Sequence, residues 1–184
     1  MGLIVGITGT LGAGKGTVAE FLMKKGFKHY SVRDFLSEKI RERNLPDNRD
    51  SLVKVANELR KQHGPSYIAE VLFERARRQG GDAIIESIRT EGEVKSLQEN
   101  GNFYLFAVDA NPELRYERIK QRKTSTDMIS YDKFIEQENR EMTSTDPTKQ
   151  NLKRCRELAD FTLKNEGSIE DLHQQVEEIL HEIR

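Results

Sequence analysis

Five short apolar or alternating runs are separated by amphipathic segments, and together they predict a chain of alternating strands and helices. The first run, residues 3–8, is rich in β-branched residues, which is typical of a strand buried on both faces. The other expected strands are residues 27–31, 82–86, 103–108 and 161–165. Because helical patterns separate the runs, they favour a parallel sheet covered by helices on both faces, a three-layer α/β fold.

Helical patterns fill the intervals between these strands. The expected helices are residues 18–25, 32–43, 50–63, 66–78, 91–99, 113–122, 131–142 and 168–183. Three of them lie between the second and third strands, more than a crossover connection requires, so we expect an insert that forms a lobe over the sheet. Residues 123–127 and 143–151 are polar with few apolar anchors, and we expect this block to move.

Length and composition restrict the class of protein. A chain of 184 residues is expected to form one domain with an ordinary core. Charged residues make up 33% of the chain but the net charge is −1, which disfavours sequence-independent binding of nucleic acid. Cys155 is the only cysteine, which excludes a disulfide framework. No apolar stretch has transmembrane length, so we expect a cytoplasmic protein without a membrane partner.

A glycine-rich segment joins the first strand to the first helix. Residues 9–17 read G-T-L-G-A-G-K-G-T, which satisfies G-x-x-x-x-G-K with the hydroxyl residue displaced by one position. Glycines let the backbone N–H groups turn toward one anion, and the helix N-terminus adds partial positive charge. Lys15 can reach the β- and γ-phosphates, and Thr17 is the hydroxyl expected at Mg²⁺. The residues assigned to ATP are Gly9, Thr10, Gly12, Ala13, Gly14, Lys15, Gly16 and Thr17.

Charged residues follow the ends of later elements. Glu86 ends the third strand, where open sheets bind ligands, and we assign it to Mg²⁺ through water; the alternative is an exposed strand-end carboxylate. Arg89 lies three residues further on, and Arg118 and Arg122 are four apart on one helix face. Phosphoryl transfer needs positive charge around the moving group, so these arginines and Lys15 are candidate catalytic residues.

Asp34 could separate two mechanisms. An aspartate beside an acceptor hydroxyl can orient that hydroxyl or take its proton, so Asp34 is also a candidate catalytic and acceptor-binding residue. An acceptor phosphate needs no base and is held by arginines instead. Asp34 could equally be an acid favoured in the first turn of a helix. Both types of acceptor stay open at this point.

Several passages resemble known nucleotide kinases. The G-K-G-T ending of the glycine segment is similar to the P-loop of adenylate kinase. Residues 31–36, S-V-R-D-F-L, resemble the stretch that opens the monophosphate-binding helices of nucleoside monophosphate kinases. Residues 84–89 resemble their strand-end D-G-F-P-R, whose arginine holds the acceptor phosphate, and residues 118–122 resemble their arginine pair before the lid. The resemblance thus implies Arg89 at the acceptor.

The C-terminal part resembles a second family. Residues 159–168 are similar to a passage near the adenine in dephospho-CoA kinases, which implies Asn165 at the nucleotide. Arg118, of the arginine pair before the lid, is also assigned to the nucleotide. The overall likeness is to a largely archaeal group of adenylate-kinase-like and dephospho-CoA-kinase-like proteins, and it covers nearly the whole chain. It implies a P-loop kinase fold with a five-stranded parallel sheet in the order 2-3-1-4-5.

The same resemblance divides the single domain, residues 1–184, into functional parts. The implied core consists of residues 1–32, 80–122 and 152–184, the acceptor-binding insert of residues 33–79 and the lid of residues 123–151.

Three positions depart from the family pattern. Ser37 stands where the family has an arginine, and Arg33 replaces the glycine before the aspartate, so Arg33 or Arg60 would have to supply the acceptor contact. Ser87 follows Glu86 where the family pattern has a glycine.

The primary hypothesis is ATP-dependent phosphoryl transfer to a small-molecule nucleotide, most simply a nucleoside monophosphate. One alternative is phosphorylation of a hydroxyl, as in dephospho-CoA kinase. A further alternative is a regulatory ATPase with no small-molecule acceptor. No N-K-x-D guanine motif occurs in the chain. The acceptor, its base and the oligomeric state stay open.

Overall fold

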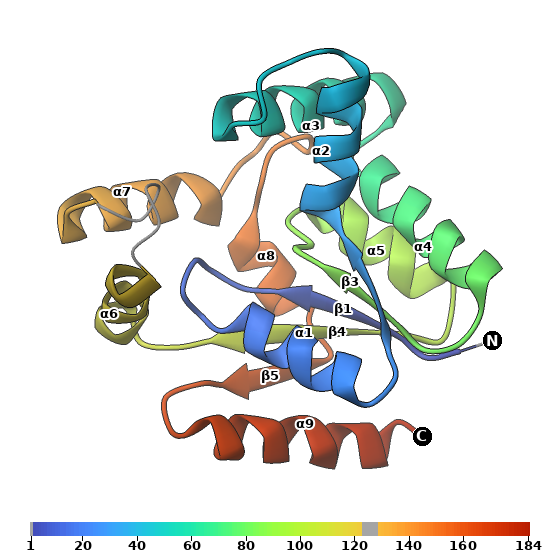
Figure 1. The fold of residues 1–184 in the computed structure, drawn as a ribbon, viewed down its shortest axis with the longest axis vertical. Helices are drawn as coiled ribbons and strands as arrows, with labels where there is room; N and C mark the ends of the chain where they lie inside the picture. Colours follow the sequence, from blue (N-terminus) through green and yellow to red (C-terminus); the bar gives the residue numbers. More distant parts are fainter. Residues whose placement is uncertain (1, 123–128) are drawn as a thin grey trace.

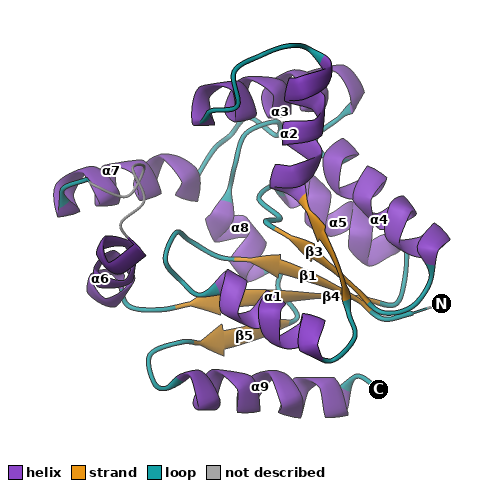
Figure 2. Ribbon diagram, in the orientation of Figure 1, coloured by secondary structure: helices purple, strands orange, loops and turns teal. Residues whose placement is uncertain are grey.

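The computed structural model describes residues 2–122 and 129–184, so residues 123–128 of the predicted lid lie outside the described residues. A five-stranded parallel sheet with the order β2-β3-β1-β4-β5 lies between two layers of helices (Figure 1, Figure 2). Its strands are β1 (Ile4–Thr8), β2 (Lys28–Ser31), β3 (Ala83–Glu86), β4 (Phe103–Asp109) and β5 (Phe161–Lys164). The predicted fold class and strand order are confirmed.

Side chains of the sheet pack in two apolar clusters, one on each face. Along β1, Val5 and Ile7 enter the cluster under α1 (Lys15–Lys24) and α9 (Ile169–Glu182), whereas Ile4 enters the opposite one. A central strand buried on both sides needs apolar residues at every position. This explains why the sequence of β1 reads as a continuous apolar run.

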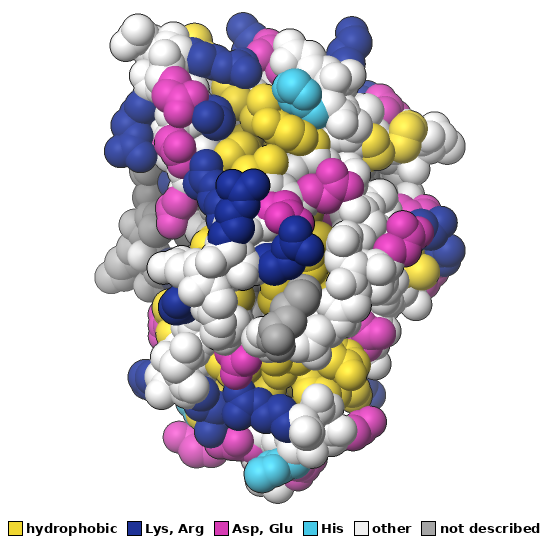
Figure 3. All heavy atoms as spheres, turned by 90° about the vertical axis from the view of Figure 1, so that its right-hand side faces the viewer, with side chains coloured by type: hydrophobic (Ala, Val, Ile, Leu, Met, Phe, Trp, Pro, Cys, Tyr) yellow, Lys and Arg dark blue, Asp and Glu magenta, His cyan; other side chains and the backbone are white. Residues whose placement is uncertain are grey.

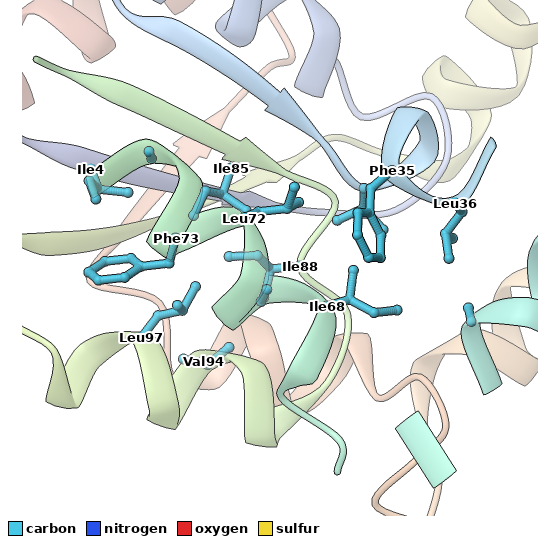
Figure 4. Close-up of a cluster of buried hydrophobic side chains, with 14 of the residues drawn as sticks. Ile4, Phe35, Leu36, Ile68, Leu72, Phe73, Ile85, Ile88, Val94 and Leu97 are labelled. Atoms are coloured by element: carbon cyan, nitrogen blue, oxygen red, sulfur yellow. The ribbon is translucent and has the colours of Figure 1, made fainter. Parts of the chain in front are cut away.

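The larger cluster joins the sheet to the helices that follow β2. These helices are α2 (Val32–Glu42), α3 (Arg49–His63), α4 (Tyr67–Gln79) and α5 (Glu91–Glu99). Figure 4 shows Phe35 of α2 facing Ile68 of α4, while Leu72 and Phe73 of α4 reach Ile85 and Leu97. Helix α4 packs on β2 and β3, so it belongs to the layer on the sheet, while α3 stands above it (Figure 1).

The remaining helices are α6 (Pro112–Arg122), α7 (Tyr131–Met142) and α8 (Leu152–Glu157). No helix among the described residues is long and apolar enough to cross a membrane. Basic and acidic side chains both occur over the face drawn in Figure 3, in keeping with the balanced charge.

Helix α8 is absent from the sequence-based prediction, which leaves residues 152–157 without an element. The side chain of Asn151 caps this helix by accepting a hydrogen bond from the N–H of Arg154 at 3.1 Å. Leu152 and Cys155 are buried beneath it. Two apolar residues in six give too short a pattern to identify a helix, and only packing against the sheet makes the segment helical.

Candidate functional site

The loop between β1 and α1 is shaped by close backbone approaches. Gly9, Gly12 and Gly14 have φ angles of 144°, 79° and 106°, which side chains rarely tolerate. A Cβ atom added to Gly9 would lie 2.4 Å from the carbonyl oxygen of Val108, and one added to Gly14 would lie 2.1 Å from Nδ2 of Asn165. The glycines are therefore required by both conformation and space.

The N-terminus of α1 is open to an anion. Its N-cap is Gly14, no side chain caps it, and its first turn contains no acidic residue. By contrast, Ser31 and Asn48 cap α2 and α3 through their side chains. The first N–H groups of a helix have no partner within the helix, so at α1 they remain available to a phosphate, assisted by the helix dipole. This arrangement fits a triphosphate.

Lys15 lies over this loop. Its Nζ atom donates hydrogen bonds to the carbonyl oxygens of Gly9 and Thr10, both at 2.9 Å. Burial, and then the positive charge of Arg89, lower the pKa of Lys15 to about 8, against the opposing effect of Glu86 and Glu141. The ammonium group therefore stays charged at neutral pH, in a position where further negative charge would stabilise it.

Asn165 and Arg118 meet beside the loop. Asn165 is buried, and its Nδ2 atom donates to the carbonyl oxygen of Ala13 at 2.8 Å. Arg118 donates from Nη2 to the carbonyl oxygen of Asn165 at 2.8 Å. Burial, followed by repulsion from Arg122, lowers the pKa of Arg118. Asn165 thus contacts the loop directly, and Arg118 is joined to the loop through Asn165.

The end of β3 is fixed next to the end of β1. The N–H groups of Ser87 and Ile88 both donate to the carbonyl oxygen of Ile7, at 3.0 and 3.1 Å. Ser87 has a positive φ of 71°, in the region that favours glycine, which is the residue of the family pattern at this position. The backbone thereby carries Glu86 and Arg89 to the carboxyl edge of the sheet, beside the loop.

Glu86 has a partner that sequence reasoning missed. His29 of β2 lies 2.9 Å from Oε2 of Glu86 through its Nε2 atom. This hydrogen bond raises the pKa of His29 and lowers the pKa of Glu86. The four histidines of the chain show no metal-ligand spacing, so the sequence pattern does not mark any of them as part of a site. Only the adjacency of β2 and β3 in the sheet identifies His29 as a neighbour of Glu86.

Arg89 makes hydrogen bonds to three other segments of the chain. Its Nη1 atom donates to Oε1 of Gln150 at 2.8 Å and to Oε2 of Glu141 at 3.3 Å. Its N–H donates to Oε2 of Glu93 at 2.8 Å, and its carbonyl oxygen accepts a hydrogen bond from the N–H of Asn151 at 2.8 Å. The arginine thus connects the β3 edge with the chain on either side of residues 143–149.

Arg60 does not fit the acceptor contact predicted for it. Its Nη2 atom donates to Oε1 of Glu93 at 3.1 Å, and the two side chains are only 4% and 1% exposed. Because the guanidinium group is enclosed and paired, it presents no open surface to an acceptor in this conformation. The structure instead gives Arg60 a supporting position behind the segment that carries Arg89.

Arg33 and Asp34 lie in the first turn of α2 and are exposed. The N–H of Asp34 donates to Oγ of Ser31, the cap of the helix, at 3.2 Å. The carboxylate of Asp34 also contributes to the raised pKa of His29. Asp34 is therefore at the same edge of the sheet as the His29–Glu86 pair, with its carboxylate open to a ligand.

Arg115 is a second residue that sequence reasoning missed. This buried arginine donates to the carbonyl oxygens of Ala110 and Leu11, at 2.8 and 3.3 Å, and makes two hydrogen bonds to the carboxylate of Glu138 in α7. It thereby ties α7 to the glycine loop. In the sequence, nothing distinguishes Arg115 from the other charged residues of its helix.

A magnesium ion at this site would be coordinated by few protein atoms. Among the described residues, no group of three or more His, Cys, Asp or Glu side chains could hold a metal ion. Thr17 lies in the first turn of α1, and Glu86 lies at the end of β3. One hydroxyl and one carboxylate, completed by phosphate oxygens and water, fit the usual coordination of Mg²⁺ at a nucleotide.

Together, the parallel sheet, the glycine loop and the uncapped helix define a P-loop kinase fold. The structure of TT1252 from Thermus thermophilus matches 100% of this chain and 99% of its own, with a TM-score of 0.64 and 22% identity. A shikimate kinase from Bacteroides thetaiotaomicron matches 97% of this chain and 98% of its own, with a TM-score of 0.59 and 15% identity. These likenesses support the fold.

Sequence relatives identify the family. A family model described as an AAA domain matches residues 5–146. The UPF0200 proteins of Methanocaldococcus jannaschii and Pyrobaculum aerophilum are each 30% identical over 98% of this chain, and the matches cover 90% and 98% of those proteins. The chain therefore belongs to the UPF0200 family. It is also 32% identical to a UPF0200/UPF0201 protein of Archaeoglobus fulgidus over 91% of this chain, but spans about half (52%) of that relative's length.

Proposed function

We propose that the protein transfers a phosphoryl group from Mg·ATP to a small-molecule nucleotide, in the manner of a nucleoside monophosphate kinase. The observation that carries this proposal is the uncapped N-terminus of α1 at the end of a closely packed glycine loop, with Lys15 above it. A fold of this kind offers the two requirements of phosphoryl transfer, a held triphosphate and positive charge around the moving group.

Each part of the site has a role in this proposal. The N–H groups of the loop and of α1 bind the phosphates, and Lys15 exchanges the carbonyl oxygens of Gly9 and Thr10 for phosphate oxygens. Arg89, Arg118 and Arg122 offset the negative charge that is transferred. Thr17, and Glu86 through water, would hold Mg²⁺, which neutralises phosphate charge when bound. Within residues 33–79, α2 and α3 supply the acceptor lobe, because α4 packs on the sheet, and residues 123–151 supply the lid, which excludes water during transfer.

A hydroxyl acceptor is the second candidate. Arg60 is paired with Glu93, and a serine occupies position 37, so an acceptor phosphate has fewer arginines to bind it. The exposed carboxylate of Asp34 lies at the same edge and could accept the proton of an acceptor hydroxyl. The bond that forms would then join the acceptor oxygen to the γ-phosphorus, while the bond to the β-phosphate oxygen breaks and ADP leaves.

An ADP-release assay tests both candidates. Purified protein with Mg·ATP is offered ribonucleoside monophosphates, deoxyribonucleoside monophosphates, dephospho-CoA and shikimate, with Lys15→Ala as the control. Stimulation by one acceptor, lost in the control, supports a kinase and names the substrate. A slow rate that no acceptor changes favours a regulatory ATPase.

Asp34→Asn then separates the acceptor types. If the acceptor is a hydroxyl, the amide can neither accept its proton nor carry the charge, and turnover should fall by about 100-fold or more. If the acceptor is a phosphate, the effect should be within a few-fold. Asp132→Asn is a suitable comparison, because Asp132 also lies in the first turn of a helix and is exposed.

A further inference from the structure

Helix α7 is held against the glycine loop by two carboxylates one turn apart. Glu138 pairs with Arg115, which in turn contacts the carbonyl oxygen of Leu11, and Glu141 pairs with Arg89. Residues three apart lie on the same face of a helix, so both carboxylates point to the same side. Figure 1 shows α7 lying above α6, which supplies Arg115. Two arginines from different elements thus fix one helix face.

The contact between α7 and the loop is close. Thr10 and Leu11 of the loop and Phe134, Gln137, Glu138 and Glu141 of α7 line a cavity of about 10 Å³. That space is comparable to a single water molecule. A phosphate group does not fit between these residues in this conformation, so a ligand there requires their side chains or α7 to shift.

Glu141 also brings negative charge to the cations that the proposed function assigns to phosphates. Its carboxylate lies 3.3 Å from Nη1 of Arg89, and its charge acts on Lys15. The two side chains of the pair are 29% and 21% exposed, so solvent reaches both partners. A carboxylate and a phosphate oxygen offer an arginine the same kind of charge-assisted hydrogen bond.

We propose that Glu141 is a resident anion of the phosphate site: its carboxylate holds Arg89 until a phosphate displaces it, which releases the C-terminal end of α7 to take a new position over the ligand. This inference rests on the proposed function, because it assumes that Arg89 and Lys15 bind phosphates. A partly exposed pair can be exchanged at small cost, whereas Arg89 without any anion would leave a partly buried charge uncompensated. The contact therefore compensates the charge of Arg89 in the unliganded site and makes phosphate binding compete with Glu141.

Calorimetric titration with ATP and with inorganic tripolyphosphate, both without acceptor, tests the competition. Glu141→Gln removes the charge but preserves the shape, and we expect both probes to bind about threefold to tenfold more tightly. Glu136→Gln is the matched control: it removes the same charge from the same helix, but Glu136 pairs with Lys133 and Arg140 on the exposed side. Its affinities should equal those of the unmodified protein. Thermal unfolding checks that both variants are folded.

A double-variant cycle separates competition for Arg89 from a general gain in positive potential. In an Arg89→Met background, Glu141→Gln should give no further gain, because the partner for which it competes is gone. Equal or weaker binding by Glu141→Gln alone would overturn the inference, and so would a gain that persists without Arg89. If the unmodified protein binds neither ATP nor tripolyphosphate, the proposed function itself fails, which is a different result.

Discussion

Two arginine–glutamate pairs lie on either side of the same short segment, and they differ in what each can do. Arg60 and Glu93 are 4% and 1% exposed, whereas Arg89 and Glu141 are 29% and 21% exposed. Glu93 also accepts hydrogen bonds from the N–H groups of Arg89 and Thr90, at 2.8 and 3.0 Å. One pair is thus built into the interior, while the other faces the ligand side of the sheet edge.

The difference shows that burial, and not residue type, decides which arginine is accessible to bind a ligand. Two enclosed charges depend on each other, because either one alone would be left desolvated without a partner. A partly exposed arginine keeps access to water and can change partners at small cost. The enclosed pair therefore supports the backbone that carries the exchangeable one.

Glu93→Gln should break the enclosed pair and cause the largest loss of stability among the variants considered. Arg60 would remain buried without a charged partner, so we expect the free energy of unfolding to fall by about 3–5 kcal/mol. Urea denaturation measures this loss. Glu91→Gln is the control two residues away: Glu91 forms exposed pairs with Lys95 and Arg154, so its replacement should lower the stability far less. Equal losses in the two variants would contradict the distinction between the pairs.

Arg89→Met should change stability little and lower turnover strongly. Because the Arg89–Glu141 pair is partly exposed, the free energy of unfolding should change by about 1 kcal/mol or less. Turnover with the acceptor identified by the ADP-release assay should fall by about 100-fold, since the site loses charge where charge is transferred. Arg77→Met, at an exposed pair with Glu74, serves as the control for both measurements. A large loss of stability with little loss of turnover would mean that Arg89, like Arg60, has a structural role.

The sequence was sufficient to place the strands and the glycine loop, because both are local, whereas the strand order followed from the family resemblance. Buried parallel strands appear as apolar runs, and the P-loop uses backbone N–H groups that glycines set within nine residues. The positive φ angles of Gly9, Gly12 and Gly14 agree with that interpretation. The assignment of particular side chains to ATP and Mg²⁺ stays a prediction.

The side-chain part of the site could not be predicted, because it depends on contacts between distant elements. Arg60 and Glu93 are 33 positions apart, and packing decides whether they are buried. In the sequence, Arg60 therefore cannot be distinguished from a surface arginine. His29 meets Glu86 only because β2 and β3 are neighbours. Arg115 meets Glu138 across two helices. Each of these partners requires the fold to be known first.

Lys15 donates its hydrogen bonds to two carbonyl oxygens, and its replacement should stabilise the free protein. The lowered pKa of about 8 means that the folded protein disfavours the ammonium group by roughly 3 kcal/mol, whereas Lys15→Met leaves the carbonyl oxygens of Gly9 and Thr10 without their donor at about 1 kcal/mol each. We therefore expect Lys15→Met to raise the free energy of unfolding by about 1 kcal/mol at pH 7, as measured by urea denaturation.

The pH dependence of this gain follows from the same shift. Between pH 8 and 10.5 the unfolded chain keeps the proton of Lys15 while the folded protein loses it, so the stability of the unmodified protein rises relative to that of Lys15→Met. The advantage of the variant should therefore shrink over this interval. An advantage that is constant with pH would mean that the ammonium group is not disfavoured by its surroundings.

Ser87 gives the smallest expected effect and separates backbone strain from charge. It has a φ of 71° directly between Glu86 and the segment leading to Arg89. A side chain in this region costs about 1–2 kcal/mol, whereas glycine loses about 0.5–1 kcal/mol more entropy on folding, so Ser87→Gly should stabilise the protein by about 0.5 kcal/mol. Ser87→Ala keeps the Cβ atom and should give no such gain. Because both arginine pairs stay intact, turnover of Ser87→Gly should be unchanged, and a loss would mean that the strained turn itself holds Arg89 in place.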